Sequence, residues 1–226
     1  MQLLSAVLVA AFTGGLWLTS IWQWAAIAKQ SKIADKTLIE TRRQIELPHR
    51  PWVQVTVKVV GDGLMFTSEG SAGITLRVSM LNSGSSPAMR VFPEIEIYPQ
   101  GPSRLRPPAE QRRLCEPLRN LGRDSGWGFP TTLFPERTEI RDVKISMMAD
   151  EIRTASSGSA DSDSTTKTCV PFVVGCVDYM FHFAEGHHQT GFIFILSRTD
   201  NRPLETMVNV PADHLYLVPL IEVDAD

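Results

Sequence analysis

The stretch Trp52-Val53-Gln54-Val55-Thr56-Val57-Lys58-Val59 alternates apolar and polar residues without a break. A period of two places successive side chains on opposite faces, and β-branched residues favour extended backbone. This stretch therefore predicts a strand with one buried face. Gly61-Asp62-Gly63 follows it, and that composition is typical of a turn. A β domain is expected to begin here.

The same alternation returns further along the chain, and the strongest signal is an apolar pair of runs separated by Glu185-Gly186. That pair predicts a buried central hairpin. About eight or nine expected strands, punctuated by turns, predict a mainly β fold, an antiparallel sandwich. The strands expected after the first are residues 64–67, 74–81, 91–98, 138–145, 170–183, 190–196, 207–210 and 215–223.

Two segments of the domain at residues 51–226 do not read as strands. Residues 100–130 are an arginine-rich insertion with a short helix expected at 109–121, and residues 155–168 are a Ser-rich loop. A solvated insertion needs no function, whereas contact with an anionic lipid or protein is the alternative. The arginines of the insertion are Arg104, Arg106, Arg112, Arg113, Arg119 and Arg123.

Residues 29–50, which precede Trp52, predict a basic helical stalk, because Lys29 to Leu47 contains neither glycine nor proline. Pro48 disfavours helix at Leu47 and ends it. Before the stalk, Leu3 to Ala28 holds no charged residue. As a helix this run spans roughly 39 Å, more than the ~30 Å of a hydrocarbon core. The sequence predicts a transmembrane helix at residues 1–28 that contacts the lipid bilayer through residues 3–28.

Trp22, Trp24 and Lys29 stand where interfacial anchors are expected at the end of this span. Ala6, Ala10 and Gly14 repeat at a spacing of four, which is a candidate surface for helix packing and self-association. A cleaved signal peptide is the alternative, since Ala26-Ile27-Ala28 resembles a cleavage site. The length of the run and the absence of a positive charge before it favour a retained single-pass anchor.

Charge is unevenly distributed along the chain. Residues 1–50 hold six lysines and arginines against three acidic residues, whereas the chain as a whole carries −3. The remaining domain is thus acidic, which argues against nucleic-acid binding. Because the lysines follow the span, the positive-inside rule predicts a cytoplasmic domain. A periplasmic domain is the alternative, since single spans with short N-terminal tails break this rule.

The three cysteines, Cys115, Cys169 and Cys176, are too few for a disulfide framework. If Cys169 and Cys176 lie on one strand, their offset of seven puts them on opposite faces, so they could not bridge each other. We expect buried free thiols, which fits a reducing compartment.

No sequence pattern specifies a reaction. His182, His187 and His188 are weak metal candidates, but no zinc-binding spacing accompanies them. We therefore assign no catalytic residue, no cofactor and no metal, and expect that the chain is not an enzyme. Asp178 lies in an apolar run and needs a partner there, for which an arginine is the expected choice.

Four spaced motifs stand out along the chain: His49-Arg50-Pro51-Trp52-Val53, Asn82-x-Gly84-x-x-Pro87-Ala88, Leu133-Phe134-Pro135 and Val174-Gly175-Cys176-Val177-Asp178-Tyr179. Together they resemble a group of bacterial membrane-anchored proteins without an assigned function. The resemblance implies a location at the bacterial inner membrane and an immunoglobulin-like β-sandwich, and it supplies no activity. We expect Gly84 to adopt a positive φ in a turn, and Gly175 to occupy a crowded core.

The sequence as a whole favours a membrane-anchored binding or scaffold module with a protein partner of unknown identity, and self-association remains open. The alternative is a membrane-tethered ligand or metal sensor, or an enzyme, that uses the histidine hairpin at residues 182–188.

Overall fold

The computed structural model describes residues 22–24, 27–41, 44, 49–101, 106–119, 131–157, 167–181 and 186–220. The chain divides into two compact units, Met1–Pro48 and His49–Asp226. In the first unit, residues 27–41 are helical and exposed, as expected for this part of the stalk. The hydroxyl groups of Thr37 and Thr41 each donate to the carbonyl oxygen four residues earlier in this helix.

Among the described residues, no helix has both the length and the apolar composition that crossing a bilayer requires. The predicted span overlaps the described residues only at 22–24, 27 and 28. Trp22 and Trp24 are 77% and 74% exposed there. The candidate packing stripe of Ala6, Ala10 and Gly14 lies outside the described residues.

The second unit is mainly β, with antiparallel sheets. A three-stranded sheet has the order β1-β2-β5, a five-stranded sheet the order β10-β8-β7-β3-β4, and β6 pairs with β9. The strands are β1 (Val53–Phe66), β2 (Ala72–Asn82), β3 (Ala88–Pro99), β4 (Thr131–Leu133), β5 (Thr138–Met147), β6 (Thr168–Cys169), β7 (Pro171–Met180), β8 (His187–Arg198), β9 (Leu204–Glu205) and β10 (Leu215–Pro219). The helices of this unit are α2 (Pro107–Arg119), α3 (Ala149–Ser157) and the short η1 (Ala212–His214).

One hydrophobic cluster joins the two larger sheets. Leu76 and Val78 on β2 belong to it together with Val173 on β7 and Leu196 on β8. Each of these side chains is at most 2% exposed. Side chains from both sheets thus form a shared core, an arrangement consistent with a β-sandwich.

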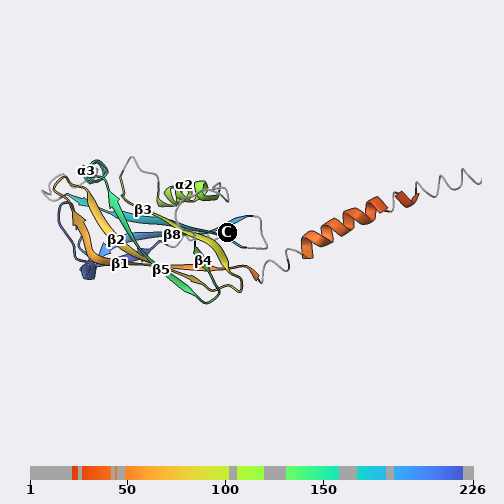
Figure 1. The fold of residues 1–226 in the computed structure, drawn as a ribbon. Coiled ribbons are helices and arrows are strands. Elements are labelled where there is room, and N and C mark those ends of the chain that lie inside the picture. The colour runs from red at the N-terminus through yellow and green to blue at the C-terminus, as the bar shows by residue number, and fades with distance from the viewer. Residues whose placement is uncertain are drawn as a thin grey trace, which may run out of the picture. The chain divides into compact units, whose positions relative to one another are not determined.

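Strand β7 is buried along its whole length, because both of its faces are covered. Val173 and Val177 face the shared core, whereas Phe172 and Val174 belong to a second cluster that includes Leu114 of α2. Figure 1 shows α2 lying along the five-stranded sheet. Even-numbered residues of β7 therefore point toward α2, and this face carries the candidate site.

The expected turn at residues 61–63 is wrong. Strand β1 continues through these residues, and its pairing with β2 shifts register between Val60 and Met65. Gly61 and Gly63 adopt φ values of 72° and 90°, which glycine tolerates, so they absorb extra residues in the strand. Leu64 then exchanges backbone hydrogen bonds of 2.9 and 3.0 Å with Val210.

Candidate functional site

A disulfide between Cys115 and Cys176 links helix α2 to the central strand β7. The two Cα atoms are 5.5 Å apart, and the cysteines are 61 positions apart in the sequence. The bond is possible because Cys176, like the other even-numbered residues of β7, faces helix α2. On the helix, Cys115 directly follows Leu114, whose side chain is buried. The expectation of free thiols is therefore wrong for Cys115 and Cys176. Cys169 is free and buried, and burial raises its pKa to about 11.

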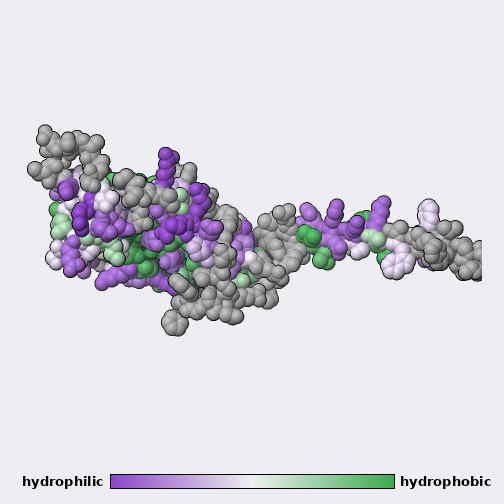
Figure 2. All heavy atoms as spheres, turned by 90° about the horizontal axis from the view of Figure 1, so that it is seen from above, coloured by the Kyte–Doolittle hydropathy of each residue, from purple (hydrophilic) through white to green (hydrophobic). Residues whose placement is uncertain are grey.

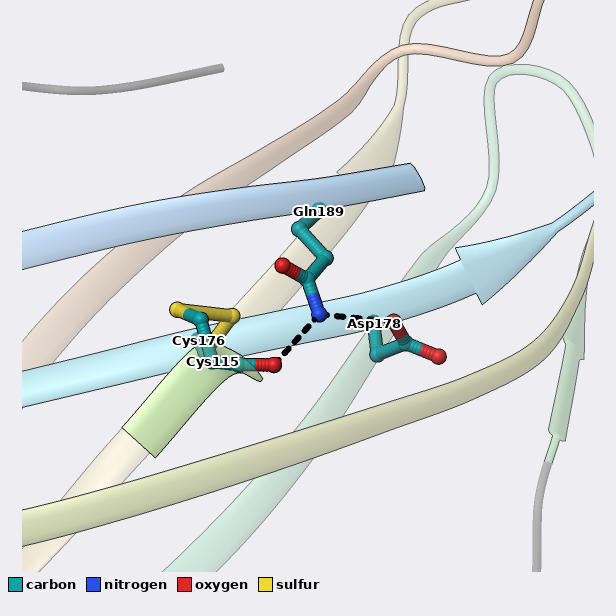
Figure 3. The surroundings of a disulfide bond; sticks show 4 residues. All are labelled: Cys115, Cys176, Asp178 and Gln189. Carbon is teal, nitrogen blue, oxygen red and sulfur yellow. Dashed lines mark hydrogen bonds between the residues drawn. A yellow bond between two sulfur atoms is a disulfide. The ribbon is translucent and has the colours of Figure 1, made fainter. Parts of the chain in front are cut away.

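A buried polar network lies beside this disulfide (Figure 3). Asp178 stands two residues after Cys176, on the same face of β7, and is directly opposite Gln189 on β8. The side-chain amide of Gln189 donates to Asp178 Oδ1 at 3.0 Å and to the carbonyl oxygen of Cys115 at 2.8 Å. One amide group thus connects both strands to the helix, alongside the covalent bond.

His187 completes this network from the start of β8. Its Nδ1 atom is 2.5 Å from Asp178 Oδ2, and the two side chains are 17% and 7% exposed. These two atoms share one hydrogen bond, which an imidazole N–H can donate to a carboxylate oxygen. The described partners of Asp178 thus include His187 and the side-chain amide of Gln189. The sequence had suggested an arginine as the partner. An aspartate that orients a histidine is an arrangement that also serves general-base catalysis, where the histidine activates a nucleophile.

Acidic residues of β3 extend the polar face under α2. Glu94 pairs in register with Cys176, and Glu96 pairs with Val174. Arg113 of α2 makes 2.6 Å contacts with both Glu96 and Glu110. Burial, and secondarily the charge of Glu96, raises the pKa of Glu94. Arg113, one arginine of the insertion, therefore has structural partners. Figure 2 shows that the face carrying α2 is largely hydrophilic.

The predicted histidine cluster is only partly described. His187 and His188 contact different partners: His187 reaches Asp178, whereas the His188 ring lies 5.9 Å from Tyr179 and 5.1 Å from Phe181. His182 lies outside the described residues. Within the described part of the chain, no group of three or more His, Cys, Asp or Glu side chains is placed to hold a metal ion.

Asn82 forms a second buried polar centre, where three of the four sequence motifs meet. Its Nδ2 atom donates to the carbonyl oxygens of Ser86 and Leu133 at 2.7 and 2.9 Å. Its Oδ1 atom accepts from the backbone of Gly84 at 3.0 Å and of Trp52 at 3.3 Å. All four hydrogen-bonding positions of the amide are thus used, and Asn82 is 0% exposed.

Gly84 serves this centre in a different way from the one expected. It is not among the described residues with positive φ. Instead, a Cβ atom added at Gly84 would lie 2.5 Å from the nitrogen of Trp52 and 2.6 Å from the Cα of Pro51. The backbone of residues 50–52 passes so close that only glycine fits.

Neither the disulfide nor the role of Gln189 was predicted from the sequence. The even spacing of Cys176 and Asp178 was the available signal, since it places both on one face of a strand. No residue pattern indicates which helix covers that face. Searches against protein-family models, curated proteins and solved structures gave no match, so function is inferred from the residues and their geometry.

Proposed function

We propose that this chain is a membrane-anchored, non-catalytic binding or scaffold module whose domain is an immunoglobulin-like β-sandwich. The uncharged run from Leu3 to Ala28 supports the anchor. The shared core of the two larger sheets supports the sandwich. In this proposal the domain contacts another protein, and a second copy of the chain is one candidate partner.

The observation that carries this proposal is that the buried polar groups hold separate elements of the domain together. Gln189 joins Asp178 to the backbone of α2, and Asn82 joins three backbone segments. Cys176 is bonded to Cys115 and so offers no thiolate nucleophile while that bond is intact. These groups hold elements together, which favours a rigid binding module over a reaction centre.

We further propose that the domain resides on the periplasmic side of the membrane, in place of the cytoplasmic side that the charge distribution favours. The disulfide supports this placement, because disulfides persist in oxidising compartments and are rare in the reducing cytoplasm. The flanking lysines argue for the opposite orientation, because they follow the uncharged run closely.

Affinity capture of the full chain from detergent extracts tests the binding function. We expect a stoichiometric partner that remains bound through washing and is missing when an unrelated single-span protein is the bait. Recovery of the chain alone, as a monomer, would contradict the proposal.

Maleimide labelling in cells tests the compartment. After acid quenching and denaturation, we expect only Cys169 to react before reduction, and all three cysteines to react after it. A Cys169→Ala variant should remove the single label. Three labels before reduction would place the domain in a reducing environment and overturn this part of the proposal.

The Asp178–His187 pair is the one observation that favours a second function, a ligand sensor or enzyme at this hairpin. If His187 acts on a ligand or substrate, His187→Gln should abolish ligand binding or turnover while the fold survives. If His187 has only a structural role, the same variant should have lower thermal stability and unchanged partner capture. We expect this second result.

A further inference from the structure

Strand β5 is an outer strand of the three-stranded sheet. Its pairing with β2 runs from Thr138 to Met147 without a register shift, and within the described part of the chain it pairs with no other strand. Prolines and bulges are among the devices that stop an edge strand from accepting another strand, and β5 contains neither. The outer edge of β5 is therefore regular enough to pair with a further strand.

The core-facing side chains of β5 are incompletely covered. Val143 and Ile145 pack against the shared core, but both are only partly buried. Their neighbours in register on β2, Leu76 and Ile74, are 0% and 2% exposed, because β2 has a strand on each side. A further strand beside β5 would bury Val143 and Ile145 in the same way and extend the core past the present edge.

Charged side chains also block pairing at many sheet edges, so their arrangement on β5 decides which strand it can accept. On the core-facing side, Arg141 contacts Glu139 of the same strand at 2.6 Å. On the exposed side, Asp142 contacts Arg77 of β2 at 2.8 Å. Three of the four charges of β5 thus have partners within the chain.

Lys144 is the fourth charge, and it takes part in no ion pair among the described residues. Its side chain is exposed, and its neighbour in register on β2 is the uncharged Thr75. The carboxylate of Asp142 has about four acceptor positions, and Arg77 uses two of them. Asp142 can therefore accept a further cation from across the edge, and Lys144 can supply one.

The sequence of β5 is complementary to itself in an antiparallel register centred on Val143. A two-fold axis there places Val143 opposite its own copy, and Asp142 of each chain opposite Lys144 of the other. Two opposite-charge pairs then form on the exposed face, and an apolar pair forms on the core-facing side. Moving the axis by one residue places either Asp142 or Lys144 opposite itself, which is destabilising.

We propose that two copies of this chain associate through β5 and so join their three-stranded sheets into one continuous antiparallel sheet. This inference rests on the proposed binding function and names the partner and the surface. The axis at Val143 pairs residues 139–147 of both copies, nearly the whole strand. A second copy fits better than an unrelated strand, because β5 itself carries the lysine and the carboxylate that this edge requires.

Cysteine crosslinking of the full chain in membranes tests the register. Val143→Cys is made in a Cys169→Ala chain, whose other two cysteines are bonded to each other. Directly opposite residues of antiparallel strands have Cα atoms about 4.5–5.5 Å apart, which suits a disulfide. Ile140→Cys is the matched control, because position 140 lies roughly 20 Å from its own copy in this register. We expect mild oxidation to give at least about five times as much covalent dimer from Val143→Cys.

Charge reversal provides a second measurement, the molar mass of the full chain in detergent by light scattering. Lys144→Glu places an acid opposite each Asp142, so we expect the dimer dissociation constant to rise at least about tenfold. Lys58→Glu is the matched control, because Lys58 is exposed on β1, two strands from this edge. Mixing the Lys144→Glu chain with an Asp142→Lys chain restores both opposite-charge pairs. We expect the mixture to dimerise more tightly than either variant alone.

Equal crosslinking from Val143→Cys and Ile140→Cys would overturn the proposal, because it would indicate random collision. So would a dimer that Lys144→Glu leaves unchanged, since such a dimer associates through another surface. A monomeric chain that captures a different protein would reject pairing through β5 and leave the binding function intact. A monomeric chain that captures nothing would reject both.

Discussion

At the scale of single residues, Asn82 makes four contacts with the backbone. Its amide satisfies two carbonyl oxygens and two backbone nitrogens that would otherwise lie within a buried junction. An unsatisfied buried polar group costs roughly 1–3 kcal/mol, so the loss of one side chain here affects several groups together.

We predict that Asn82→Ala lowers the free energy of unfolding by about 2–4 kcal/mol. Chemical denaturation of the full chain measures this change. Ser83→Ala is the control, because the Ser83 hydroxyl donates to the carbonyl of Trp52 from an exposed position and its loss should cost under about 0.5 kcal/mol. Equal effects of the two substitutions would show that the amide does not organise this junction.

Gly175 gives a second prediction at this scale. It lies opposite Phe192 on β8, and a Cβ atom added at Gly175 would strike the ring of Phe192. The crowding expected from the sequence is thus explained by an aromatic side chain that covers the glycine. We predict that Gly175→Ala destabilises the domain by about 1–3 kcal/mol, measured by thermal unfolding.

The companion substitution Phe192→Leu tests the cause of that loss. If the ring causes the strain, the double variant should be more stable than the sum of the two single effects predicts. Strict additivity would indicate that the alanine disturbs the backbone of β7 instead.

Glu94 leads to a prediction about pH. Burial raises the pKa of Glu94 in the folded state above its ordinary value. The folded protein therefore holds this proton more tightly than the unfolded chain, and stability falls as pH rises through the folded pKa. Glu94→Gln removes this penalty, so we expect a higher melting temperature at pH 7 and no gain at pH 4. Glu69→Gln, at an exposed position, should show no such difference. A gain of equal size at both pH values would contradict the assignment.

At the scale of elements, helix α2 depends on long-range attachments. The disulfide, the Gln189 hydrogen bond and the ion pair of Arg113 with Glu96 all hold it to the five-stranded sheet. Its apolar contribution is modest, since Leu114 and Leu118 are its buried large side chains in the described part of the chain. The covalent bond is therefore expected to dominate its attachment.

We predict that Cys115→Ser lowers the free energy of unfolding by about 4 kcal/mol, the chain-entropy value for a loop of this length. The same loss should appear when the unmodified chain is melted with reductant, and Cys115→Ser should no longer respond to reductant. Cys169→Ala is the control that keeps the response, because Cys169 is free. A Cys115→Ser variant that still responds to reductant would contradict the assigned pairing.

Elements that depend on local pattern were predictable, and those that depend on distant contacts were not. The β7–β8 hairpin was expected because two apolar runs flank a short polar turn. The continuation of β1 past Gly61 was missed, because Gly61-Asp62-Gly63 has the composition of a turn, whereas β1 resumes its pairing with β2 at Met65 and Phe66 and also bridges Leu64 to Val210. A Cys169–Cys176 bond was excluded on the assumption of one shared strand, whereas Cys169 lies on β6 and Cys176 on β7. No residue pattern selects Cys115 as the partner of Cys176, because Cys115 lies on a helix from another part of the chain.

At the scale of the whole molecule, two chemical signals disagree about the compartment of the domain in the proposed membrane-anchored chain. The lysines after residue 28 favour the cytoplasm by a bias of a few charges. The disulfide requires that two thiols remain oxidised throughout the life of the protein, and the cytosol opposes that continuously. The second constraint is thermodynamic and persistent, whereas the first acts once during insertion, so the disulfide carries the greater weight.

Paired reporter fusions and membrane extraction test the resulting topology. We predict that a C-terminal fusion to a reporter active only in the periplasm is active, and that its cytoplasmic counterpart is silent. Replacement of Lys29, Lys32 and Lys36 by glutamine should leave this result unchanged or strengthen it, because it removes the opposing charges. If the proposed anchor is retained, the chain should stay with membranes through alkaline carbonate washing, since an uncharged run of 26 residues is long enough for the hydrocarbon core. A periplasmic chain released by the wash would instead indicate cleavage near Ala26-Ile27-Ala28, which keeps the oxidised domain but removes the anchor. An active cytoplasmic reporter on a chain whose Cys115 and Cys176 remain bonded would show that the disulfide does not report the compartment.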